Sequence, residues 1–140
     1  VYMSLTYHLV QRPDKSEGAL EGSKLYYGQI KIRQQVDFDT LCERIADRST
    51  ASKGDVMVVI DGLIRVLTTE LQAGNSVQMG EFGNFRLSVG SSGVANAEDF
   101  NTSLFKKGKI IFTPGSRLRS MSASPKFERI ELKPATTDEP

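Results

Sequence analysis

Cysteine and histidine are almost absent from this chain. Cys42 and His8 are the only residues of their kinds. A single cysteine cannot form an internal disulfide, which fits a reducing, cytoplasmic setting. Cys42 lacks the basic cluster or second cysteine of a reactive thiol, and it lies on an apolar helical stripe, so we expect it to be buried. His8 lies on the polar side of a predicted strand, and we expect it at the surface.

Long apolar runs and catalytic motifs are missing as well. No run approaches the ~20 residues that span a bilayer, and residues 1–5 lack the charged and apolar regions of a signal peptide. We find no nucleophile elbow, zinc-protease motif, phosphate-binding loop or paired cysteine ligands. The sequence therefore predicts a soluble protein that is not an enzyme and that needs no metal and no cofactor.

The formal net charge is only +1, so the overall charge of the chain does not indicate binding to nucleic acid. The distribution is more informative. From Lys106 to Arg129 the chain has seven basic residues and a single acidic one, Glu128. Such a segment is either a solvated surface or a face that contacts phosphate, and its composition alone does not separate the two.

Two helices are predicted in the first half of the chain. Asp37 is a suitable N-cap for a short helix from Phe38 to Arg48. Ser52 opens a long helix that runs to about Ala73, with Gly74 as the residue after its end. The apolar stripe of the long helix is too wide for the short helix to cover, so the sheet or a second subunit must cover it. This stripe consists of Val56, Val59, Ile60, Leu63, Ile64, Leu67 and Leu71.

A glycine- and phenylalanine-rich stretch, residues 80–85, follows the long helix. Phe82 and Phe85 are three residues apart, whereas residues on one face of a strand are two apart. A turn or bulge at Gly83 would let both rings reach one core. The stretch therefore predicts a junction between helix and sheet that is packed around aromatic rings.

The remaining patterns predict strands. Alternation indicates strands over residues 3–10 and 26–33, which either pair with each other or extend another sheet. Further strands are expected over residues 85–89, 107–113 and 126–132, with a possible helical turn at 97–100 and a short helix or turn at 115–121. From Lys133 on, we expect a disordered tail.

The order of these elements resembles the bacterial histone-like HU and integration host factor family. Two separated signatures carry the resemblance, which covers about residues 37–121. They consist of Val77, Gly80, Phe82, Gly83 and Phe85, and of Phe112, Pro114, Gly115, Leu118 and Arg119. The added strands before residue 37 resemble the longer HU-like variants of Bacteroidetes-type bacteria.

The resemblance implies an α+β, HU-like fold: two helices, an antiparallel sheet with a β-arm, and a short C-terminal helix, here with an added N-terminal hairpin. It divides the chain into residues 1–36, an HU-like domain at 37–121, and a strand with its tail at 122–140. It also implies an intertwined homodimer whose core includes Phe82, Phe85, Ile60, Leu63, Ile64 and Leu67. Family members bind duplex DNA and bend it with arms in the minor groove.

The predicted arm departs from the family. The family's arm carries several arginines and a proline wedge, whereas residues 90–105 contain no proline, arginine or lysine and include Glu98 and Asp99. Without an apolar wedge or cations there, we expect weak bending at most, since an acidic tip repels phosphate. The residues expected to contact phosphate are Arg86, Lys106, Lys107, Lys109, Arg117 and Arg119.

Two functions follow from these features. The first is a homodimeric, nucleoid-type protein that binds double-stranded DNA without sequence specificity, in the cytoplasm. The second is an HU-like assembly module that has lost DNA bending, with a protein partner at the edge of the N-terminal strands.

Overall fold

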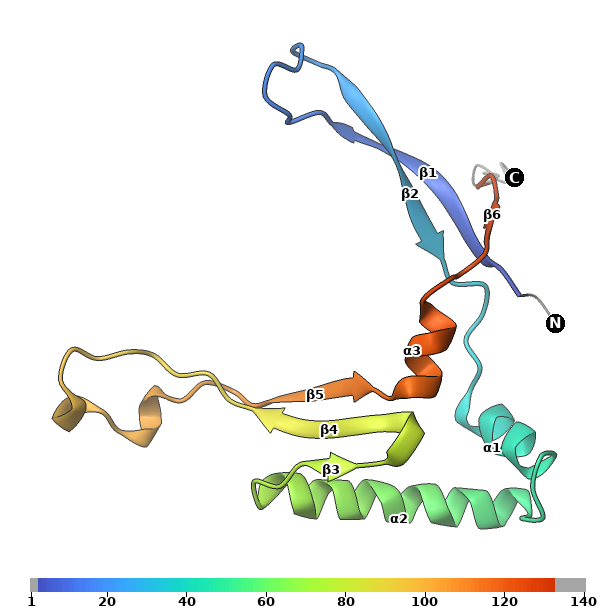
Figure 1. Ribbon diagram of the computed structural model, residues 1–140, viewed down its shortest axis with the longest axis vertical. Coiled ribbons are helices and arrows are strands. Elements are labelled where there is room, and N and C mark those ends of the chain that lie inside the picture. Colours follow the sequence, from blue (N-terminus) through green and yellow to red (C-terminus); the bar gives the residue numbers. More distant parts are fainter. Residues whose placement is uncertain (1–2, 133–140) are drawn as a thin grey trace, which may run out of the picture. The chain divides into compact units, whose positions relative to one another are not determined.

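The computed structural model of the chain describes residues 3–132 and has a mixed α+β architecture (Figure 1). The described residues fall into two compact units. One consists of residues 3–36 and 124–132, and the other of residues 37–123. The tail that the sequence predicts to be disordered lies outside the described residues.

Both predicted helices are present in the unit of residues 37–123. Helix α1 spans Phe38–Ala46, and the side chain of Asp37 accepts a hydrogen bond from the Thr40 N–H at 2.8 Å. It ends two residues before the predicted Arg48, because Asp47 already forms its C-cap. Helix α2 spans Lys53–Gln72 and begins with the expected capping box at Ser52. Gly74 follows its C-cap with a φ of +85°, which confirms the predicted end of the helix.

An antiparallel sheet of three strands lies along α2 (Figure 1). The strands are β3 (Val77–Gln78), β4 (Gly83–Ser88) and β5 (Lys109–Pro114), in the order β3-β4-β5. The short 3-10 helix η1 (Gly80–Phe82) joins β3 to β4, and α3 (Ser116–Ser122) follows β5. The predicted strand over residues 107–113 is thus shorter at its start, and the predicted terminal helix is confirmed.

Between β4 and β5 the chain makes a long excursion, residues 89–108. An antiparallel bridge between Ser91 and Phe105 connects its outgoing and returning parts. Its far end holds two short 3-10 helices, η2 (Ala97–Asp99) and η3 (Thr102–Leu104), where the sequence predicts a helical turn. Figure 1 shows that this excursion projects beyond the end of the three-stranded sheet.

The other unit is a sheet built on a hairpin. Strands β1 (Leu5–Pro13) and β2 (Lys24–Lys31) pair antiparallel, so the first of the two predicted alternatives is correct. Strand β6 (Phe127–Arg129) pairs parallel with β1 and is shorter than the predicted 126–132. The sheet order is β2-β1-β6, so β2 forms one edge.

The environment of His8 differs from the prediction. The ring is half-buried, and its Nδ1 atom is buried without a hydrogen-bond partner among the described residues. Ile130 lies next to it in the register, because the Ile130 N–H donates to the Tyr7 carbonyl at 2.8 Å. The segment that follows β6 therefore lies beside His8, which remains partly exposed.

The apolar core is very small. Of the described residues, three apolar side chains are buried: Cys42, Val56 and Leu71. Burial of Cys42 is as predicted. Most of the stripe on α2 stays at least partly exposed, including Val59 at 70% and Ile64 at 56%. The sheet therefore covers one end of the stripe, and most of the apolar surface of α2 is left without a partner among residues 3–132.

Candidate nucleic-acid interface

The two sequence signatures meet where η1 leads into β4 and where β5 leads into α3. The Gly115 N–H donates to the Phe82 carbonyl at 3.0 Å, and the Met79 N–H donates to the Gly83 carbonyl at 2.8 Å. A Cβ atom at Gly83 would overlap the carbonyl oxygen of Thr113, and one at Gly115 would overlap the carbonyl oxygen of Glu81. Both positions therefore require glycine, because backbone lies where a side chain would begin.

Three phenylalanine rings pack beside this junction. The Phe82 and Phe85 centroids are 6.3 Å apart, and Phe112 lies 5.4 Å from the first and 4.9 Å from the second. The prediction that both rings of the junction reach one cluster is confirmed. Phe82 nevertheless remains 49% exposed, so one chain does not complete the cluster.

The register of β4 and β5 gives the sheet two different faces. Phe85 is opposite Phe112 and Leu87 is opposite Ile110, so these four side chains share one face. Three of them, Phe85, Leu87 and Ile110, line an open apolar groove of about 450 Å³. Ile64, Leu67 and Leu71 of α2 line the other side of this groove. This face of the sheet is therefore turned toward α2.

The opposite face of the same strands carries two of the predicted cations. Arg86 pairs with Ile111, and Lys109 is two residues from Ile111 on β5, so the two cations are diagonal neighbours. Lys106 and Lys107 continue along the return segment, where the Lys106 N–H donates to the Gly90 carbonyl at 2.7 Å. The structure thus brings Arg86, Lys106, Lys107 and Lys109 onto one two-stranded ribbon.

The two arginines of α3 differ from this group. Arg117 Nε lies 3.6 Å from Glu81 Oε2, so its charge has an intramolecular partner. Side chains two positions apart on a helix point in different directions, so Arg117 and Arg119 cannot both face one surface. Sequence reasoning missed Glu81, although an acidic residue between two signature glycines was a usable signal.

Charge is segregated within this unit. Residues 37–75 contain seven acidic and four basic residues, whereas residues 76–123 contain three acidic and six basic ones. No ion pair within residues 3–132 engages Arg86, Lys106, Lys107, Lys109 or Arg119. The sheet half is therefore the positive half of a unit that is neutral as a whole.

The end of the excursion is acidic, but it is not free of apolar side chains. Phe100 and Phe105 pack edge to face with centroids 5.4 Å apart, and they remain 40% and 49% exposed. Val94 is also 40% exposed. Glu98 and Asp99 precede Phe100 directly, so any approach to phosphate there is opposed by charge.

Two acidic side chains of the helical half, Asp37 and Asp55, accept hydrogen bonds from the backbone at the starts of the helices. Hydrogen bonds from the Thr40 and Ser52 backbone N–H groups lower the pKa of Asp37 and Asp55 below 3.8. A hydrogen bond to Asp39 raises the pKa of Lys53, whose Nζ lies 2.6 Å from the Asp39 carboxylate. Residues 3–132 contain no group of three histidine, cysteine, aspartate or glutamate side chains that would suit a metal ion.

Two helices beside a small antiparallel sheet, a two-stranded ribbon that projects from the sheet, and paired glycine signatures define an HU-like domain. The chain belongs to the HU-HIG family, described as an HU domain fused to a wHTH, Ig or glycine-rich motif, whose sequence model matches residues 3–129. No curated protein matches the chain. Within residues 3–132, no helix is both long enough and apolar enough to cross a bilayer.

A solved structure supports the fold. A protein of Bacteroides vulgatus, described as a "putative bacterial DNA binding protein", superposes with a TM-score of 0.63 at 17% identity. The match covers 96% of this chain and 51% of that one, so the chain spans about half the length of that relative. A mutant of HU from Thermotoga maritima matches 62% of this chain and 99% of its own at 23% identity, with a TM-score of 0.46.

Proposed function

We propose that the protein is a homodimer that binds double-stranded DNA without sequence specificity, through phosphate contacts, as a component of the nucleoid. One observation carries the proposal: four cations lie on the ribbon, and none has an ion-pair partner within residues 3–132. Cations without partners, gathered on one surface, are what a phosphate backbone requires. Family membership and the description of the Bacteroides vulgatus protein agree with it.

The proposed phosphate contacts are not equally well supported by the structure. Arg86 and Lys109 share the sheet face that is turned away from α2. Lys106 and Lys107 lie in the segment that leads into β5. Arg119 is a further contact, whereas Arg117 must first leave Glu81. These contacts reach phosphates and no base edges, so they supply affinity without sequence readout.

Exposed apolar side chains on α2 and on the sheet support the proposed dimer. The groove between α2 and the sheet is lined largely by apolar side chains, and Phe82, Ile64 and Leu87 are between 43% and 56% exposed. Ile60, Leu63, Leu67 and Phe85 are half-buried. We propose that a second copy covers these residues. The stability of the fold then depends on protein concentration.

Salt dependence tests the DNA contacts. If all four ribbon cations of both chains contact phosphate, eight contacts give a slope of log K against log salt of about −7. Raising the salt from about 50 to about 200 mM would then weaken duplex binding by about 10⁴-fold. Absence of duplex binding at the lower salt concentration would refute the proposal.

A matched pair of variants locates the contacts. Lys106→Gln with Lys107→Gln should make the slope less steep by about 0.9 for each phosphate that is no longer neutralised. Arg44→Gln with Arg48→Gln removes the same charge from exposed positions of the acidic half and should leave the slope unchanged. Equal effects of the two double variants would show that the sheet is not the DNA-binding face.

The second candidate is an HU-like dimer that serves as an assembly module. The acidic end of the excursion and its partly exposed Phe100 and Phe105 favour it. Strand β2 also leaves one edge of its sheet unpaired, where a partner strand can add. A dimer that binds no duplex at low salt but co-purifies reproducibly with one protein would favour this function over the first.

A further inference from the structure

The N-terminal hairpin has two unlike faces, which the register defines. Leu5, Tyr7 and Leu9 of β1 lie on the same face as Ile30 of β2 and Phe127 of β6. The opposite face is mixed in polarity, and its two charged side chains, Arg12 and Lys31, are both positive. It consists of Thr6, His8, Val10 and Arg12 from β1 and of Leu25, Tyr27, Gln29 and Lys31 from β2.

Charge on the hairpin strands has a single sign. Strands β1 and β2 contain Arg12, Lys24 and Lys31 and no acidic residue, and the acidic residues of the hairpin are confined to the loop between them. None of the three cations is in an ion pair within residues 3–132, whereas Arg33 just beyond β2 is paired with Glu128 at 3.3 Å. The three cations of the strands are therefore available to bind an external anion.

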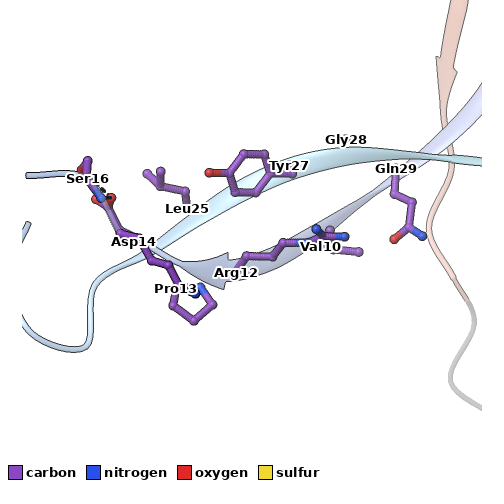
Figure 2. Close-up of a pocket in the computed structure, with 10 residues that line it drawn as sticks. Val10, Arg12, Pro13, Asp14, Ser16, Leu25, Tyr27, Gly28 and Gln29 are labelled. Carbon is purple, nitrogen blue, oxygen red and sulfur yellow. Dashed lines mark hydrogen bonds between the residues drawn. The ribbon is translucent and has the colours of Figure 1, made fainter. Parts of the chain in front are cut away.

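A concave surface lies on this positively charged face. It encloses about 750 Å³ and is lined by Arg12, Tyr27 and Gln29 together with the beginning of the loop. Figure 2 shows the side chains of Leu25 and Tyr27 beside each other along β2, with Val10 and Arg12 on the neighbouring strand. The Tyr27 ring is 46% exposed, so it offers ring surface to a ligand in the concavity.

We propose that this face of the hairpin binds a single-stranded nucleic acid, with an unpaired base stacked on Tyr27 and phosphates held by Arg12 and Lys31. Base stacking on an exposed aromatic ring beside a positively charged track is the usual physical basis of such binding. In the register, Lys31 lies six residues from the position opposite Arg12, or about 20 Å along the strand. Tyr27 and Gln29 lie between these two cations, where the bases would be.

A single strand fits this surface better than a duplex. In a duplex the faces of the bases are stacked on each other, so a tyrosine ring in a concavity can reach only their edges. The proposal is independent of the duplex contacts assigned to the sheet, because it uses other residues in the other unit.

Asp14 determines where the phosphates would lie. Its carboxylate accepts hydrogen bonds from the N–H and hydroxyl groups of Ser16, at 2.9 and 2.5 Å, and these bonds lower its pKa. It therefore stays ionised at the loop end of the concavity (Figure 2). Lys15 is next to this negative charge, so we assign the phosphates to the strand residues and not to the loop.

Anisotropy with labelled oligothymidylate and oligouridylate of about 15 nucleotides tests the proposal. Tyr27→Ala should weaken binding about tenfold or more, and Tyr27→Phe should retain it because the ring is kept. Tyr26→Ala is the matched control, since Tyr26 is adjacent in sequence but lies on the opposite face. Arg12→Gln with Lys31→Gln should weaken binding and reduce its salt dependence without changing the hairpin's apolar contacts.

The outcomes separate this proposal from duplex binding. A wild-type protein that binds duplex but neither oligonucleotide would overturn the inference and leave the proposed function intact. Equal losses in the Tyr26 and Tyr27 variants would also overturn it. A preference for oligothymidylate or for oligouridylate would identify DNA or RNA as the source of the strand. Loss of binding in Lys106→Gln with Lys107→Gln, but not in the hairpin variants, would place the single strand on the sheet instead.

Discussion

Replacing Gly115 by alanine should separate the two signatures that meet at the junction. The φ of Gly115 is −80°, which any residue adopts, so the backbone conformation itself does not exclude alanine. The obstacle is the Glu81 carbonyl, which occupies the position of the new Cβ atom. A backbone carbonyl cannot move to another rotamer, so the start of α3 and the 3-10 helix η1 must move apart.

The magnitude follows from these contacts. Overpacking a well-packed site costs about 1–3 kcal/mol, and breaking the hydrogen bond from the Gly115 N–H to the Phe82 carbonyl costs about 1 kcal/mol more. We therefore expect the free energy of unfolding to fall by about 3 kcal/mol. For a domain of this size, that lowers Tm by roughly 10–20 °C.

Urea unfolding followed by circular dichroism measures the effect, at one protein concentration because a dimer's stability depends on it. Gly93→Ala is the control, since an added Cβ there meets nothing within 4 Å and its φ is not positive. We expect this control to change stability by no more than about 0.5 kcal/mol. If Gly115→Ala is as stable as the control, the close approach of the two signatures does not exist.

Three further predictions concern the unit of residues 37–123. Phe82→Ala should destabilise the dimer by about 3–5 kcal/mol in the same assay; a dimer as stable as the wild type would show that a second copy does not bury the ring. Ser52→Ala removes the cap of α2 and should cost about 1 kcal/mol, measured by thermal unfolding, whereas Ser52→Gly should cost a few tenths. Because the pKa values of Asp37 and Asp55 are lowered in the folded state, their contribution to stability is present above pH 3.8 and is lost as the pH falls below it. Asp37→Asn with Asp55→Asn should abolish that part of the acid transition; an unchanged pH profile would refute it.

Local rules were sufficient for the helices and the junction. The caps at Asp37 and Ser52 and the glycine after α2 each follow from a few neighbouring residues, and each is present in the structure. The clustering of Phe82 with Phe85 was also predictable, because the spacing of two glycines and two rings leaves few arrangements that cover both rings.

Contacts between distant segments were not predictable in the same way. Strand β6 joins β1 across more than 100 residues, and its three residues carry no pattern that specifies a parallel partner. The partial burial of His8 was missed for the same reason, since the segment beside it could not be placed. The collision that requires glycine at Gly115 likewise depends on Glu81, which lies in the other signature. The residues proposed to contact DNA remain predictions in both the sequence and the structure.

Dimer formation and DNA binding, the two parts of the proposed function, are physically linked. The salt dependence of duplex binding depends on both. Four ribbon cations in a single chain would give a slope of about −3.6, whereas two ribbons in a dimer would give about −7. A unit with equal numbers of acidic and basic residues gains little from long-range attraction, so its affinity depends on how many of these local contacts form together. Disrupting the apolar groove with Ile64→Glu should therefore halve the slope even though no DNA contact has been changed. A protein that becomes monomeric while keeping the steeper slope would show that one ribbon alone, with residues outside those assigned here, makes all the phosphate contacts.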